Sequence, residues 1–251
     1  TASLTNADLY ISVEDTGQAD IRQYGAYPLA FWTNNTEKIR INTAGDIYNK
    51  PQTDTRQSTF FGINTGNQLV STGLYNQSFG YEAAYSNTTG EKNTGLGHRA
   101  LYNSTTSSRN TAIGYQTLYN LNNTGSDNTA IGYASANSLT SAERNVFVGG
   151  FSGANVETNS YNTALGYSAF RYGNGDQNTA MGYFSMGTST NVSGQLNTAM
   201  GVRSLEDITT GSENTGIGAD AGKSITTGYN NVSMGRNALT TNTVGFNNVA
   251  I

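Results

Sequence analysis

Apolar and small residues recur along most of the chain at a spacing close to 17 residues. The segment "NTAIGYQTL" at 110–118 returns as "NTAIGYASA" from residue 128, "NTALGYSAF" from 162 and "NTAMGYFSM" from 178. The copies begin at Asn76, Asn93, Asn110, Asn128, Asn145, Asn162, Asn178, Asn197, Asn214, Asn231 and Asn248, after a degenerate copy, "STFFGI", at Ser58. So short a repeat predicts a solenoid in which each copy forms one coil.

The third residue after each Asn is apolar in every copy, and we call this position the Ile column. It includes Ile113, Ile131, Val148, Leu165, Met181, Met200 and Ile217. An invariantly apolar position is typical of a buried one, so these residues are predicted to form a stacked core column.

The first residue after the Asn, the Thr column, is usually Thr and sometimes Val, and the second, the Ala column, is mostly Ala or Gly. Because side chains alternate between the two faces of a strand, the Thr column is expected to share the core face with the Ile column. The Ala column, with Ala112, Ala164 and Ala199, is then predicted to face outward, where small residues favour contact with another subunit.

Two further positions define the shape of the coil. The fourth residue after the Asn is Gly wherever a copy is complete (the Gly column), and a second Gly precedes most Asn residues by three places. Glycine turns a chain through positive φ without a steric penalty, so two corners per coil are expected. The eighth position, the Leu column, supplies a second apolar wall: Leu101, Leu118, Phe170, Met186, Leu205 and Leu239.

These columns predict an all-β fold: a parallel β-solenoid of ~17-residue coils across 58–251, about 11 coils and a partial one. Stacked Asn amides are expected to form a hydrogen-bonded ladder. Residues 1–57 lack the period, but "LYISVED", "ADIRQYG", "PLAFWTN" and "EKIRINTAGDI" indicate a small β-rich lead-in segment. We expect the chain to be part of a longer polypeptide.

Composition excludes several classes of protein. Charged residues make up 12%, the net charge is −4, and there are 30 Gly, two Pro and no Cys. High Gly without Pro excludes collagen, 16 Tyr and 9 Phe argue against disorder, and the absence of a basic surplus argues against nucleic-acid binding. No apolar run is long enough for membrane insertion of this segment.

Candidate chemistry is sparse, and we predict no enzyme activity, catalytic residue, metal site or cofactor. His98 is the only His and stands where other copies have Tyr, so it is interpreted as a surface variant of the repeat. The segment "GNGDQN" at 173–178 resembles a calcium turn, but its Asp does not recur in successive coils, as a calcium repeat would require.

The fifth position after the Asn, the Tyr column, is the best candidate for recognition. It holds Tyr81, Tyr115, Tyr133, Tyr167 and Tyr183, and elsewhere Gly150, Val202, Ala219 or Arg236, so it is not deep core. A half-exposed ring offers an apolar face and a solvated hydroxyl, which suits either stacking on sugars or contact with a subunit.

The segment "YPLAFWTNNTEKIRINTAGDI" followed by "NTAIGYQTLYNLNNTG" units resembles the shafts of phage tail fibres. The repeat is also similar to the "NSVAIG" coils in the heads of trimeric autotransporter adhesins, although it reads Asn-Thr-Ala-Ile with a longer period. Both resemblances imply a homotrimer, and neither carries over a catalytic residue.

The leading hypothesis is therefore a structural and adhesive virion protein: the rigid trimeric shaft of a tail fibre, roughly 50–60 Å long at ~4.8 Å per coil. Its expected partners are other virion tail proteins and a host surface receptor, either a glycan or an outer-surface protein. The alternative is a bacterial cell-surface adhesin head. An ice-binding solenoid ranks lower, because the repeated outward "TxT" pair of a flat ice face is missing.

Overall fold

A computed structural model describes residues 8–13, 19–24, 29–33, 36–41, 47–48, 58–69, 73–122, 124–187 and 192–251. The chain divides into two compact units, Thr1–Thr55 and Arg56–Ile251. This division falls close to the boundary expected between the lead-in segment and the repeats. The described residues form strands and turns, and they include no apolar helix that could cross a membrane.

The first unit contains two small antiparallel sheets. Strands β1 (Asp8–Val13) and β2 (Ala19–Tyr24) pair with each other. Strands β3 (Leu29–Thr33), β4 (Thr36–Ile41) and β5 (Ile47–Tyr48) form the second sheet, with a register shift after Phe31. The expected strand-rich character of this segment is confirmed. The stretch "YNKPQTDTRQ" at 48–57, which we interpret from the sequence as the junction to the repeats, lies outside the described residues after Tyr48.

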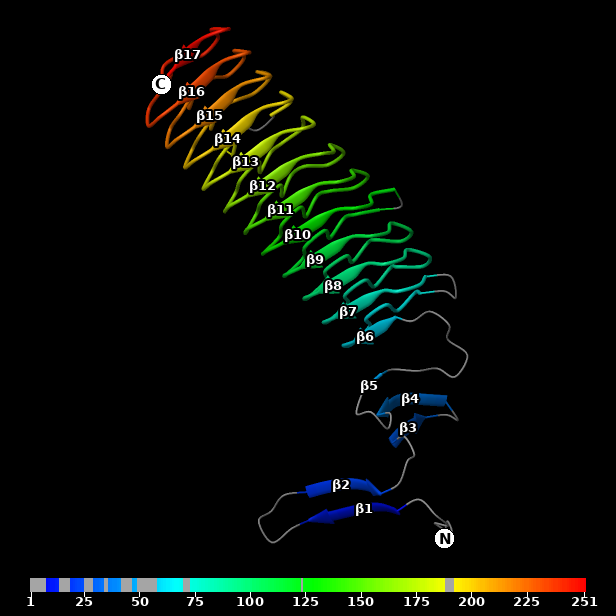
Figure 1. Cartoon of the computed structure of the whole chain (residues 1–251). Coiled ribbons are helices and arrows are strands. Elements are labelled where there is room, and N and C mark those ends of the chain that lie inside the picture. Colours follow the sequence, from blue (N-terminus) through cyan, green and yellow to red (C-terminus); the bar gives the residue numbers. More distant parts are fainter. Residues whose placement is uncertain are drawn as a thin grey trace. The chain divides into compact units, whose positions relative to one another are not determined.

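The second unit is a parallel β-solenoid of about 11 turns of ~17 residues, as predicted (Figure 1). Each coil contributes one short strand to a single sheet of 12 strands stacked in chain order. The strands are β6 (Thr59–Phe61), β7 (Gln77–Phe79), β8 (Thr94–Leu96), β9 (Thr111–Ile113), β10 (Thr129–Ile131), β11 (Val146–Val148), β12 (Thr163–Leu165), β13 (Thr179–Met181), β14 (Thr198–Met200), β15 (Thr215–Ile217), β16 (Val232–Met234) and β17 (Val249–Ala250). Equivalent residues pair directly, such as Ala130 with Ala112 and Phe147.

The two glycine positions act through different physical causes. Gly114, in the Gly column, has φ of +134°, and a Cβ there would lie 2.3 Å from the carbonyl O of Gly132 in the next coil. Gly175 represents the second position and does not have positive φ, so the predicted left-handed corner is wrong there. A Cβ at Gly175 would lie 1.9 Å from the Gly194 carbonyl O, so the close approach of these two coils requires Gly at this residue.

The remaining turns place non-glycine residues in the left-handed region. In the coil that starts at Asn110 these are Gln116 (φ 50°), Leu118 (φ 49°) and Asp127 (φ 60°), and equivalent residues of other coils repeat the conformation. Such a conformation costs roughly 1–2 kcal/mol per residue for an L-amino acid. Each of these three backbone N–H groups donates a hydrogen bond to a carbonyl of an adjacent coil, at 2.9–3.2 Å.

The predicted Asn ladder is present and buried. The Asn145 backbone N–H and its Nδ2 both donate to Asn128 Oδ1, at 3.1 and 3.0 Å. The same Nδ2 donates to the Asn159 carbonyl O at 3.0 Å, and Asn145 Oδ1 accepts the backbone N–H of Asn162 at 2.9 Å. One amide therefore joins three successive coils.

The predicted orientation of the strand faces is wrong. The Ala column points inward: Ala112, Ala130, Phe147, Ala164, Ala180 and Ala199 are fully buried. The Ile column points outward and is not the core column expected: Leu165 is 44% exposed and Met200 40%, while Ile113, Ile131, Val148, Met181 and Ile217 are half-buried. The Thr column shares this outer face.

The core is narrow, and this explains why the small residues face it. The Ala column lies opposite the Leu column, in which Leu101, Leu118, Phe170, Met186 and Leu205 are buried and only Leu239 is half-buried. Where the first column carries a ring, the second carries no side chain: a Cβ on Gly153 would lie 2.6 Å from the Phe147 ring. Phe60 and Gly66 repeat this pairing, so in these two coils the ring of one column fills the space that a side chain of the other would need.

Moving the large side chain from the Ala column to the Leu column of one coil tests this arrangement. Phe147→Ala should leave a cavity and destabilise the array by about 3–5 kcal/mol, and Gly153→Leu should overpack it. The double variant recreates the Ala112 and Leu118 pair of another coil and should recover most of the loss. Thermal melting of all four proteins measures the coupling, and additive losses would contradict shared packing.

Removing one ladder amide should destabilise the array more than its volume suggests. Asn145→Ala leaves the Asn162 N–H and Asn159 carbonyl without their side-chain partner, at about 1–3 kcal/mol per buried group. Asn122→Ala, at an exposed position outside the strands, is the control and should melt as the parent does. Equal melting temperatures for both variants would contradict a stabilising role for the ladder.

Candidate functional site

The Tyr column forms a ladder of exposed aromatic rings directly after the Gly corner. Tyr81, Tyr115, Tyr133, Tyr167 and Tyr183 are all exposed, between 41% and 54%. His98 belongs to the same ladder and stacks between the Tyr81 and Tyr115 rings at centroid distances of 5.1 and 5.0 Å. Tyr115 and Tyr133 continue the stack at 5.2 Å, and assignment of these rings to recognition or to subunit contact stays a prediction.

The stacking of this ladder changes at one coil. Gly150 occupies the Tyr column there, and the ring of the following residue, Phe151, stands between its neighbours. Phe151 lies edge-on to Tyr133 at 5.2 Å and 68°, and edge-on to Tyr167 at 5.9 Å and 86°. Tyr167 and Tyr183 then resume the stack at 5.9 Å.

A second ladder, which the sequence analysis missed, runs beside the first. Tyr85, Tyr102 and Tyr119 stack at 5.2 and 5.1 Å, nearly parallel. The recurrence of Tyr at the ninth position after Asn76, Asn93 and Asn110 was the available signal. In the next three coils this position holds Asn137, Ala154 and Arg171, so the ladder ends after Tyr119.

A charged pair accompanies the second ladder. Arg99 Nε donates to Glu82 Oε2 at 2.7 Å, and its guanidinium lies 5.4 Å from the centroid of the Tyr102 ring. The hydrogen bond from Arg99 lowers the pKa of Glu82, and the bond to Glu82 raises the pKa of Arg99. Burial raises the pKa of Tyr102. The Arg99–Glu82 pair is therefore fully ionised at neutral pH.

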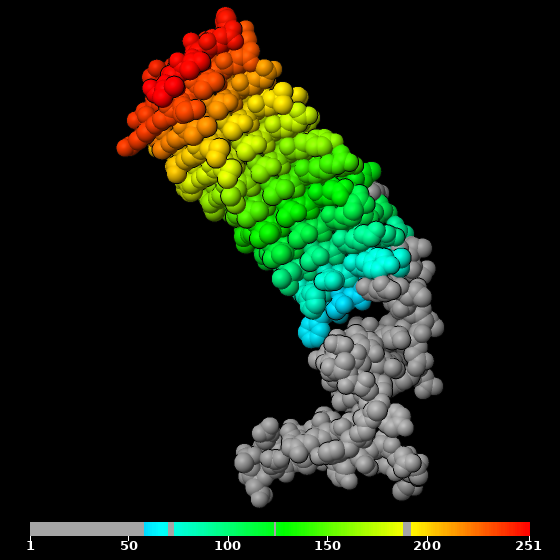
Figure 2. All heavy atoms as spheres, viewed as in Figure 1, coloured from blue at the N-terminus to red at the C-terminus, as the bar shows by residue number. Residues whose placement is uncertain are grey.

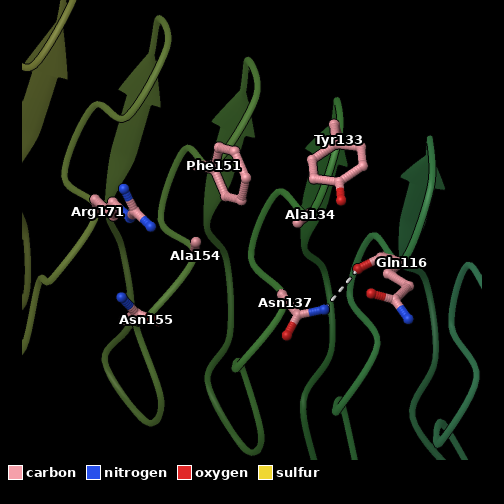
Figure 3. A pocket seen from close by; sticks show the side chains of 8 residues that line it. All are labelled: Gln116, Tyr133, Ala134, Asn137, Phe151, Ala154, Asn155 and Arg171. Carbon is pink, nitrogen blue, oxygen red and sulfur yellow. Dashed lines mark hydrogen bonds between the residues drawn. The ribbon is translucent and has the colours of Figure 1, made fainter.

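Where the second ladder ends, the surface is hollowed into a groove of about 250 Å³ (Figure 3). We call this hollow the Phe151 groove, and its lining residues come from four successive coils. They are Gln116, Tyr133, Ala134, Asn137, Phe151, Ala154, Asn155 and Arg171. No carboxylate is among them.

The outer sheet face is a second candidate surface. The Ile and Thr columns run along the whole sheet, and the stacked coils form successive bands (Figure 2). The outward residues of 40% exposure or more include Phe61, Leu96, Val146, Leu165, Met200 and Met234. A contiguous exposed apolar area of this kind is more often an interaction surface than a surface that faces only solvent.

The acidic residue of the "GNGDQN" segment has a structural explanation. Asp176 Oδ1 accepts the backbone N–H of Ser160 at 2.8 Å and the Asn159 Nδ2 at 3.4 Å, so it joins two coils. In the described ranges, no group of three or more His, Asp or Glu residues is arranged to hold a metal ion.

No protein-family model, curated protein or solved structure matches this chain.

Proposed function

We propose that the chain is the rigid shaft of an extracellular attachment fibre of the phage tail-fibre type, assembled as a homotrimer in the virion. The observation that supports this most is the outer sheet face, on which apolar side chains run the length of the solenoid. The proposed role is structural and adhesive rather than catalytic. Its partners are two further copies of the chain, other virion tail proteins and a host surface receptor.

The apolar face fits a partner with the same repeat. A surface that recurs once per coil is matched along its full length by another copy with the same step, and closed rotational symmetry is the usual arrangement of identical chains. This face therefore replaces the Ala column as the proposed subunit contact, since Ala112, Ala164 and Ala199 are buried inside each chain. The number three rests on the resemblance to trimeric fibres and adhesins.

The mechanical role follows from the stacking. Every coil between the first and the last bonds to the coil before it and the coil after it, so bending the rod requires many hydrogen bonds to stretch together. At ~4.8 Å per coil, the array holds its two ends roughly 50 Å apart. Such a rod keeps a receptor-binding element at a fixed distance from the particle.

The oligomeric state tests the interface directly. The parent chain should have three chain masses by light scattering after size exclusion, and the pair Leu165→Glu with Met200→Glu should give folded monomers, because charge opposes burial at the interface. The control pair, Thr210→Glu with Thr227→Glu at exposed turns, should stay trimeric. A well-folded parent monomer would contradict the proposed assembly.

The location of the protein tests the function. Gold-labelled antibodies against the solenoid should mark the tail fibres of phage particles in electron micrographs. Particles that lack the gene should remain unlabelled. Label on the envelope of bacterial cells instead would favour the adhesin hypothesis and contradict the virion shaft.

A further inference from the structure

The Phe151 groove exists because two aromatic columns change in the same coils. After Tyr119 the position of the second ladder holds Asn137 and Ala154, which are much smaller than Tyr and leave a hollow beside the first ladder. Buried Ala134 and Ala154 line it. The volume, about 250 Å³, lies at the lower end of the range of small-molecule pockets, which suits one or two sugar rings.

Two rings at an angle form the apolar side of the groove. Tyr133 is 54% exposed and Phe151 is half-buried, and their ring planes meet at 68° (Figure 3). Gly150 has no side chain that could cover them. An exposed aromatic face of this kind packs against the C–H face of a pyranose ring, and the Tyr hydroxyl stays solvated.

Three amides provide the polar side. Asn137 Nδ2 donates to the Gln116 backbone carbonyl O at 3.1 Å, and this bond fixes the orientation of the Asn137 side chain. Asn155 is exposed beside it, and the Gln116 side chain also lines the groove. A carboxamide donates and accepts hydrogen bonds at once, and so does a sugar hydroxyl, so the two groups are complementary.

Arg171 supplies one positive charge that no carboxylate of the described residues neutralises. Its guanidinium lies 4.9 Å from the Phe151 ring centroid and 5.3 Å from that of Tyr172, and its Nε is buried without a hydrogen-bond partner, which leaves the terminal nitrogens for a ligand. Three other arginines of the array are paired: Arg99 with Glu82, Arg109 with Asp127 and Arg203 with Asp220. A guanidinium held by stacking alone has donors left for a carboxylate ligand.

We propose that the Phe151 groove binds a hexuronic acid unit of a cell-surface polysaccharide. Tyr133 and Phe151 pack on the ring, the amides of Gln116, Asn137 and Asn155 bond the hydroxyls, and Arg171 binds the carboxylate. A single cation on a chain of net charge −4 does not suit a polyphosphate such as nucleic acid. The site goes beyond the proposed shaft function, because it makes the side of the rod a binding surface.

The test uses the full chain and two matched sets of probes. Tetrasaccharides containing glucuronic, galacturonic or mannuronic acid are titrated calorimetrically against the protein, beside the same oligosaccharides with their carboxyl groups reduced to alcohols. At least one acidic form should bind at least tenfold more tightly than its reduced counterpart, because a charge-assisted hydrogen bond is lost on reduction.

Three variants assign the binding to the groove. Arg171→Gln should weaken binding of the acidic form about tenfold or more and leave the reduced form unchanged. Tyr133→Ser, at an exposed ring, should weaken both forms. The control, Arg236→Gln, removes an exposed arginine from the Tyr column several coils away and should change neither. Melting temperatures equal to the parent confirm that each variant is folded.

Several outcomes would overturn the site. They are equal affinity for acidic and reduced sugars, parent-like binding by Arg171→Gln, and no binding of any acidic tetrasaccharide at millimolar concentration. The result is independent of the proposed assembly, because light scattering on the same samples reports the oligomeric state. A monomer that binds the sugar contradicts only the trimer, and a trimer that does not bind contradicts only the groove.

Discussion

The register between successive coils depends on the buried Asn amide. Its Oδ1 accepts the backbone N–H of the next Asn, and its Nδ2 donates back to the previous amide and forward to a carbonyl near the end of its own coil. Because an amide has both donor and acceptor atoms, one residue type satisfies this geometry in all the coils after the first, which begins with Ser58. The in-register sheet, the stacked side-chain columns and the two aromatic ladders all depend on that fixed step.

The repeat period was sufficient to predict the fold, but not which strand face is buried. Alternation places the Ile and Ala columns on opposite faces without saying which one is inside. Hydrophobicity favoured Ile113 and its equivalents, yet the narrow coil has room only for Ala beside the Leu column. The deciding signal was a relation between two columns: Phe147, which broke the Ala pattern, is matched by Gly153 six residues later.

The candidate sites were predictable to different degrees, for a related reason. The exposed Tyr column follows from its tolerance of Gly150 and Arg236, so position and exposure could be inferred from one column. The Phe151 groove depends on what is missing from neighbouring columns in several coils, and on Arg171 leaning over Phe151. Such a hollow becomes visible only when adjacent columns are placed side by side in space.

The left-handed residues described above have a consequence for how the rod is made. Gln116, Leu118 and Asp127 hold unfavourable conformations that are compensated by hydrogen bonds reaching outside their own coil, Gln116 to His98 and Leu118 to Ser135. A coil without neighbours has the strain and lacks the compensation, so it is unstable alone. Once two or three coils are in place, each exposed end provides the template for the next. The array should therefore form by slow nucleation and fast one-dimensional growth, like the zippering of a helix from a costly first turn.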